Sequence, residues 1–110
     1  MKITFSKYAK AFDEACVHWN KDRKVNIMFL KLMQAHANDL LKAKRTVFLN
    51  EVYELLGLPR TQDGQIVGWH YDLVKPTGDN YIDFDLDNIT ESSSAIILDF
   101  NVDGKVIQYL

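Results

Sequence analysis

The chain has 110 residues, 47% of them apolar and 25% charged, which is an ordinary composition for a globular protein of one domain. A domain of this length can be stable without metal ions or disulfides, and the single cysteine, Cys16, excludes an internal disulfide. No apolar run approaches the roughly 18 residues of a membrane span, and the start of the chain lacks the apolar region of a signal peptide. We therefore expect one cytoplasmic domain over residues 1–110, without membrane contact.

Charge is divided unevenly along the chain. Residues 1–45 contain ten Lys/Arg and four Asp/Glu, a net charge of +6, whereas residues 46–110 contain three and eleven, a net charge of −8. The two halves can attract each other inside one fold, or a charged face can serve a partner of opposite charge. We favour the first explanation for the basic half and the second for the acidic half.

The first predicted element is an amphipathic helix near the N-terminus. An aromatic stripe of this kind is typical of a core face, so we expect its side chains to be buried. Its apolar residues recur at spacings of three and four: Phe5, Tyr8, Phe12, Cys16 and Trp19.

A second helix is predicted from Val25 to Arg45. Its polar stripe consists of Lys31, Gln34, Asn38, Lys42 and Arg45, and its apolar side is wide. Such a helix is either central to the core or part of a subunit interface. We predict a homodimer; the competing explanation is that the first helix covers this surface within one chain. The predicted oligomer interface consists of Ile27, Met28, Leu30 and Met33.

A short third helix, a tight corner and a strand are predicted between Val47 and Trp69. Asn50 is a suitable N-cap, with Glu51 in the first turn near the positive end of the helix dipole. Gly57 is a suitable helix stop. Turn residues follow at 62–64, and Gly68-Trp69 then begins the first strand.

After Trp69 the apolar period changes from that of a helix to that of a strand. Apolar and polar residues alternate over 69–73, 82–87 and 98–103. Asp103-Gly104 predicts a hairpin whose return strand, Lys105 to Leu110, places Ile107 and Tyr109 beside Phe100 and Leu98. We therefore predict an α+β fold, in which two N-terminal helices and a short third helix pack on an antiparallel meander of about four strands.

Four segments of the chain carry a further signal: FLNEVYELLGLPRT with its Leu49-Asn50 helix start and LGL corner, GQIVGW, DNYIDFDL and AIILDFNVDG. Together they resemble the C-terminal portion of an uncharacterised family of small proteins encoded by phages and prophages of Gram-positive bacteria. The resemblance covers about Met33 to Ile107, and many longer relatives carry a membrane-spanning segment and linker that this chain lacks. It implies a phage-like origin, in a bacterial host cell, and no catalytic activity.

Motifs that carry chemistry are mostly absent. The glycines are scattered, and the sequence contains neither Cys-x-x-Cys nor His-x-x-x-His. Asp83, Asp85 and Asp87 have the spacing that opens a calcium loop, but the sixth position is Asn88 and the twelfth is Ser94 instead of glycine and glutamate. We therefore predict no enzyme, no catalytic residue, no cofactor and no metal site.

The remaining feature is a set of aspartates on two predicted strands. If the strands are neighbours, like charges oppose one another on one face, which folding alone does not require. A basic partner surface, a second subunit that covers the face with its Lys and Arg, or strands that are not adjacent would each explain the pattern. The predicted partner-binding site is Asp83, Asp85, Asp87, Asp99 and Asp103.

The leading hypothesis is a phage accessory protein that binds another protein, a host protein with a basic surface, and inhibits a host defence nuclease by imitating nucleic-acid charge. A second hypothesis is a nucleic-acid binder, which is weak because no aromatic residues lie among its cations. Those cations are Lys21, Arg23, Lys24, Lys31, Lys42 and Arg45. A third hypothesis is a structural protein that oligomerises through the second helix.

Overall fold

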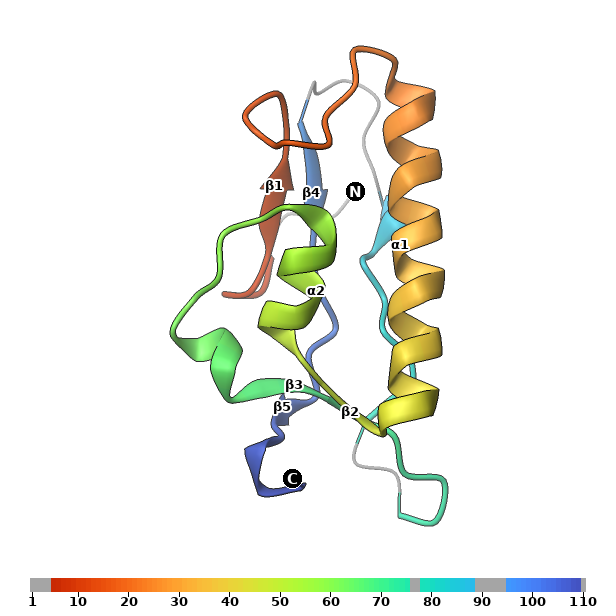
Figure 1. Cartoon of the computed structure of the whole chain (residues 1–110), viewed down its shortest axis with the longest axis vertical. Coiled ribbons are helices and arrows are strands. Elements are labelled where there is room, and N and C mark those ends of the chain that lie inside the picture. Colours follow the sequence, from red (N-terminus) through yellow and green to blue (C-terminus); the bar gives the residue numbers. More distant parts are fainter. Residues whose placement is uncertain (1–4, 76–77, 89–94, 110) are drawn as a thin grey trace.

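The longest element of the computed structural model is helix α1 (Arg23–Lys44), which runs along one side of the molecule (Figure 1). The structure describes residues 5–75, 78–88 and 95–109. Two small antiparallel sheets lie beside α1, one toward each end of the molecule. The first sheet pairs β1 (Lys10–Phe12) with β4 (Ile96–Leu98). The second has the order β2 (Thr46–Phe48), β3 (Val67–His70), β5 (Gly104–Lys105).

Helix α1 confirms the predicted second helix, and local capping explains its ends. The Asp22 carboxylate accepts a hydrogen bond from the Lys24 N–H (2.9 Å), which satisfies a free donor of the first turn. At the other end Arg45 adopts a left-handed φ of 71°. Leu30 and Leu41 are fully buried at a spacing of eleven residues, so one side of α1 lies in the core.

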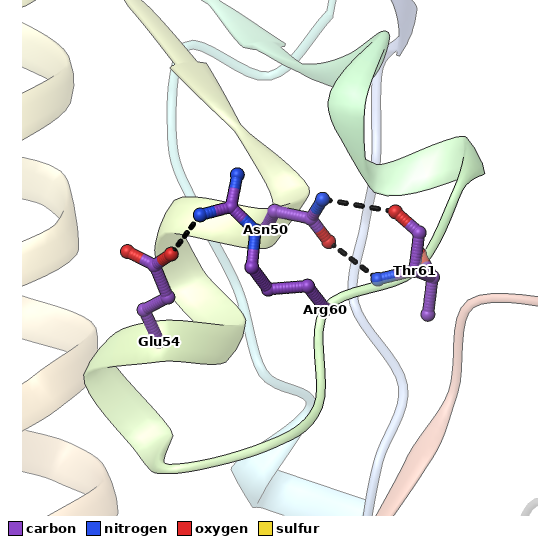
Figure 2. Close-up of polar contacts among 4 residues, drawn as sticks. All are labelled: Asn50, Glu54, Arg60 and Thr61. Carbon is purple, nitrogen blue, oxygen red and sulfur yellow. Dashed lines mark hydrogen bonds and ion pairs between the residues drawn. The ribbon is translucent and has the colours of Figure 1, made fainter.

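Helix α2 (Leu49–Leu56) is the predicted short helix, and it packs against α1, β2 and β3. Gly57 ends it with φ 72°, as predicted. The predicted N-cap was wrong, since Phe48 is the cap and its N–H donates to Glu51 Oε2 (2.7 Å). Asn50 instead lies inside the helix, where its amide bonds both the N–H and the C=O of Thr61 and so fixes the following corner (Figure 2).

The predicted first helix was wrong. Residues 5–19 form turns and strand β1, which pairs with β4 from the other end of the chain. Asp13 Oδ1 accepts a hydrogen bond from the Ala15 N–H, and such local side-chain bonds compete with a helix. Phe12 is nevertheless fully buried, with ring centroids 5.7 Å from Trp19 and 5.8 Å from Phe29. Tyr8 and Trp19 are partly buried against the core, so these aromatic residues reach it from a strand and its turns, whereas Phe5 is 47% exposed and its predicted burial was wrong.

The single four-stranded meander was also wrong, because the C-terminal chain contributes to both sheets. No strand forms over the described residues 78–88. Asp103-Gly104 makes no hairpin, since Gly104 pairs with Gly68 of β3. Tyr109 lies in a 3-10 turn and stacks on the His70 ring at 3.8 Å instead of reaching Leu98. Leu110 lies outside the described residues.

Gly68 sets the spacing of the three-stranded sheet. A Cβ there would lie 2.0 Å from the Val47 carbonyl oxygen, so only glycine permits this approach of β2 to β3. The neighbouring Trp69 pairs with Val47 and is fully buried, as expected for an apolar position of the alternation that begins at residue 69. Its indole N–H lies 3.0 Å from both the Asn101 carbonyl and the Asn101 Oδ1.

Trp69→Ala should lower the free energy of unfolding by about 3–5 kcal/mol, because it leaves a large cavity and removes the donor to Asn101. Trp69→Phe, which keeps most of the ring volume, should lose roughly 1–3 kcal/mol. Urea denaturation followed by circular dichroism measures both. An unchanged midpoint for Trp69→Ala would contradict the role of this ring in the core.

Candidate functional site

The segment that carries Asp83 and Asp85 is held on one side by polar side chains of α1. Asn38 accepts from the Ile82 N–H (2.7 Å) and donates to the Ile82 C=O (2.9 Å). One turn earlier, Gln34 Oε1 accepts from the Phe84 N–H (2.8 Å). Asn38 and Gln34 were predicted on the outward polar stripe, but they take the place of a neighbouring strand for this segment.

Asn101 holds the same segment from the other side. Its Oδ1 accepts from the Asp83 N–H (2.7 Å), and its Nδ2 donates to the Tyr81 C=O (2.8 Å). With both edges bonded, side chains alternate as in a strand: Ile82 and Phe84 are fully buried, and Asp83 is half-buried on the other face. The predicted alternation is therefore real, although no regular strand forms.

Three of the five predicted aspartates border one hollow, named here the acidic hollow: Ser6, Tyr8, Asp83, Asp85, Asp99, Phe100, Asn101 and Val102. Asp99 is 7% exposed, and its Oδ1 accepts from the Ser6 N–H (3.2 Å). Asp83 Oδ1 accepts from the Asp85 N–H (2.8 Å), while Asp85 adopts a left-handed φ of 62°. These bonds fix the carboxylates of Asp99 and Asp83, and the Asp85 Oδ1 accepts from the Asn88 side-chain amide (2.6 Å).

Tyr53 supports the rim of the acidic hollow at Tyr8, one of its lining residues. Burial raises the pKa of Tyr53 to about 12, so its hydroxyl stays protonated and donates to the Tyr8 carbonyl oxygen (3.0 Å). The Lys10 ammonium lies 5.6 Å from the centre of the Tyr53 ring, which places one cation near this rim.

The other two predicted aspartates lie apart from the acidic hollow. Asp87 is exposed in the 3-10 turn Leu86–Asn88 and borders a second hollow beside the first turns of α1. Asp103 Oδ2 accepts from the His70 N–H (3.1 Å). Burial raises the pKa of the Asp103 carboxyl, against the lowering effect of that bond, and the charge of Asp79 raises it further.

The residues predicted as an oligomer interface do not share one surface. Leu30 is fully buried, Ile27 and Met33 are partly buried against the core, and only Met28 is exposed, at 64%. The exposed apolar residues that the prediction missed are Val25, three residues before Met28, and Leu32, four residues after it. A helical projection that placed Gln34 and Asn38 inward would have found them.

The predicted cations lie around α1. Lys21, Lys24, Lys31, Lys42 and Arg45 are exposed, and Arg23 is half-buried. The Arg45 guanidinium lies 5.3 Å from the centre of the Tyr71 ring. Among the described residues no three His, Cys, Asp or Glu side chains are grouped to hold a metal ion. Ser94 of the calcium-loop comparison lies outside them.

No helix in the described part of the chain is both long and apolar enough to cross a membrane. Residues 1–110 match a family of unknown function, DUF6353. The chain belongs to this family. The match to DUF6353 extends beyond the Met33 to Ile107 of the resemblance seen in the sequence, and the phage origin stays a prediction. Comparisons with curated proteins and with solved structures gave no match.

Asn38→Ala should destabilise the fold by about 2–4 kcal/mol, because it leaves the N–H and C=O of Ile82 without their partner in a buried place. Asn38→Leu fills the volume without restoring the bonds, so it should be destabilised as well. Chemical denaturation measures both against Gln62→Ala, an exposed amide truncated in the same way. A Leu variant as stable as the parent would show that volume, and not hydrogen bonding, matters at this position.

Asp103 should make stability depend on pH. Since its folded-state pKa is raised, its contribution to stability is present at low pH and is lost as pH rises through that pKa. Asp103→Asn keeps an acceptor for His70 and removes the charge, so the variant should gain stability relative to the parent between about pH 3 and pH 7. Denaturation across this range, with the exposed Asp63→Asn as control, measures the difference. If the free energy of unfolding of variant and parent differed by the same amount at every pH, the raised pKa of Asp103 would be contradicted.

Proposed function

We propose that this protein is a non-enzymatic phage or prophage accessory protein that acts in the bacterial cytoplasm by binding another protein through the acidic hollow. The observation that supports it is the convergence of Asp83, Asp85 and Asp99 on one concave surface. The five aspartates of the sequence pattern lie in three different places. The proposed binding site therefore consists of Asp83, Asp85 and Asp99 only.

The arrangement of the carboxylates favours a basic partner. Negative side chains in a concave site focus the local potential, which attracts cations and raises the rate of association with a basic surface. Asp99 is bonded to Ser6 and Asp83 to the Asp85 N–H, so the charges keep fixed positions before any partner arrives. Preorganised charge reduces the entropy lost on binding.

Fixed carboxylates at short intervals along a chain also imitate the charge of a nucleic-acid backbone. We therefore propose that the partner is a host protein with a basic nucleic-acid channel, such as a defence nuclease, and that binding blocks the channel. Such binding should weaken with salt, because exposed charges more than about 10 Å apart are already largely screened at 0.1 M ionic strength and this distance shortens as salt is added.

The test uses Asp83→Asn with Asp85→Asn, which removes two charges and keeps the side-chain acceptors. Asparagine also tolerates the left-handed backbone at position 85. The matched control is Glu14→Gln with Asp63→Asn, two exposed carboxylates outside the acidic hollow. Immobilised parent, variant and control are each incubated with bacterial host lysate at low and high salt, with and without competing duplex DNA.

The parent and the control should capture the same basic protein, and duplex DNA should displace it. The double variant should capture roughly tenfold less at low salt, with a smaller difference at high salt. Equal capture by a folded double variant, or capture that duplex DNA does not reduce, would refute the charge-imitation proposal.

A further inference from the structure

The outward side of α1 carries an apolar stripe that no described part of the chain covers. Val25 is 43% exposed, and Met28 and Leu32 are each 64% exposed. Their spacings of three and four place them on one side of the helix, where the exposed Ala35 continues the line. The inward side of the same helix is already filled by residues such as Leu30 and Leu41, so the stripe is additional to the core face.

A row of lysines follows one flank of this stripe. Lys24, Lys31 and Lys42 are spaced by seven and eleven residues, so their positions around the helix axis agree to about 20°. All three are exposed. The opposite flank carries Phe29 and His36 instead. Over residues 24–35 the outward face of α1 is therefore asymmetric, apolar along its centre and basic along one edge. The exposed Asp39, one turn after Ala35, ends the apolar stripe.

A hollow lies beside the N-terminal half of the lysine row. Lys24 and Lys31 border it on the helix side, and Ile27 and Leu86 contribute apolar surface. Its remaining lining residues are Asp22, Arg23 and Asp87.

We propose that the outward face of α1 is a docking surface for an amphipathic helix of a partner protein, one with an apolar stripe and a row of Asp or Glu along one flank. Two helices that pack side by side bury their apolar stripes against each other, and the flanking residues then meet in pairs. The lysine row therefore selects acidic residues on the facing flank. This surface is separate from the acidic hollow and does not depend on its function.

Charge excludes a second copy of this chain as the favoured occupant. In a twofold antiparallel pair of helices each flank faces its own copy, so the lysine row would face a lysine row. In a parallel pair it would face the flank of Phe29 and His36. Helix α1 contains one acidic residue, Asp39, against five basic ones, so neither arrangement supplies carboxylates to the row.

The test uses two labelled synthetic helical peptides with the same leucine stripe, which differ only in one flank, glutamate in one and lysine in the other. Fluorescence anisotropy measures their binding to the full chain at low salt. The glutamate peptide should bind roughly tenfold or more tightly than the lysine peptide. Met28→Ser with Leu32→Ser should weaken binding of the glutamate peptide by a similar factor.

Matched variants distinguish binding at the outward face of α1 from non-specific hydrophobic binding. Leu73→Ser with Val74→Ser removes two apolar side chains of similar or greater exposure, 69% and 88%, from another part of the surface and should leave binding unchanged. Replacement of Lys24, Lys31 and Lys42 by glutamate should reverse the preference, so that the lysine peptide binds more tightly. Replacement of the exposed Lys7, Lys75 and Lys105 by glutamate should leave the preference for the glutamate peptide in place.

Three results would overturn the proposal. The first is equal affinity for both peptides or none for either, and the second is binding that survives Met28→Ser with Leu32→Ser. The third is evidence for a different occupant while the glutamate peptide fails to bind. That evidence would be a dimer seen by light scattering, or binding to phosphatidylglycerol vesicles, which Met28→Ser with Leu32→Ser abolishes.

Discussion

Buried asparagine side chains hold the irregular part of this fold in place. Asn26, Asn38 and Asn50 are each at most 8% exposed, and each accepts from the N–H and donates to the C=O of a single residue distant in sequence or outside its helix. Their partners are Asn20, Ile82 and Thr61 respectively. A buried backbone without a neighbouring strand needs such partners, since an unpaired N–H or C=O is costly in the interior.

This pairing explains how a chain with so little regular sheet keeps a defined surface. Asn38 and Asn101 bond the two edges of the segment around Ile82 and Asp83, so the segment is fixed although it joins no sheet. Ile82 and Phe84 then fill the core, and Asp83 and Asp85, which alternate with them, line the acidic hollow. Aspartate lacks the donor and leucine lacks both groups, so neither residue replaces asparagine here.

The uneven charge of the sequence becomes two separate surfaces in the structure. The carboxylates of Asp83, Asp85 and Asp99 gather at the acidic hollow, and Lys24, Lys31 and Lys42 follow the outward face of α1. Asp87 lies at the border between them, in the hollow that Lys24 and Lys31 also line. Attraction between the two halves thus acts locally, in the ion pair of Lys44 with Glu51 and around Asp87.

The sequence by itself determined α1, the stop of α2 at Gly57, the buried Trp69 and the alternation around Asp83, because capping, glycine conformation and side-chain period act over a few residues. Only the tertiary structure decided that the aromatic residues from Phe5 to Trp19 belong to a strand and turns, and which aspartates meet. Periodicity states which face of a segment is buried, but it does not state which backbone lies beside it. That choice depends on hydrogen bonds between distant residues, such as Asn38 with Ile82, which no local pattern encodes.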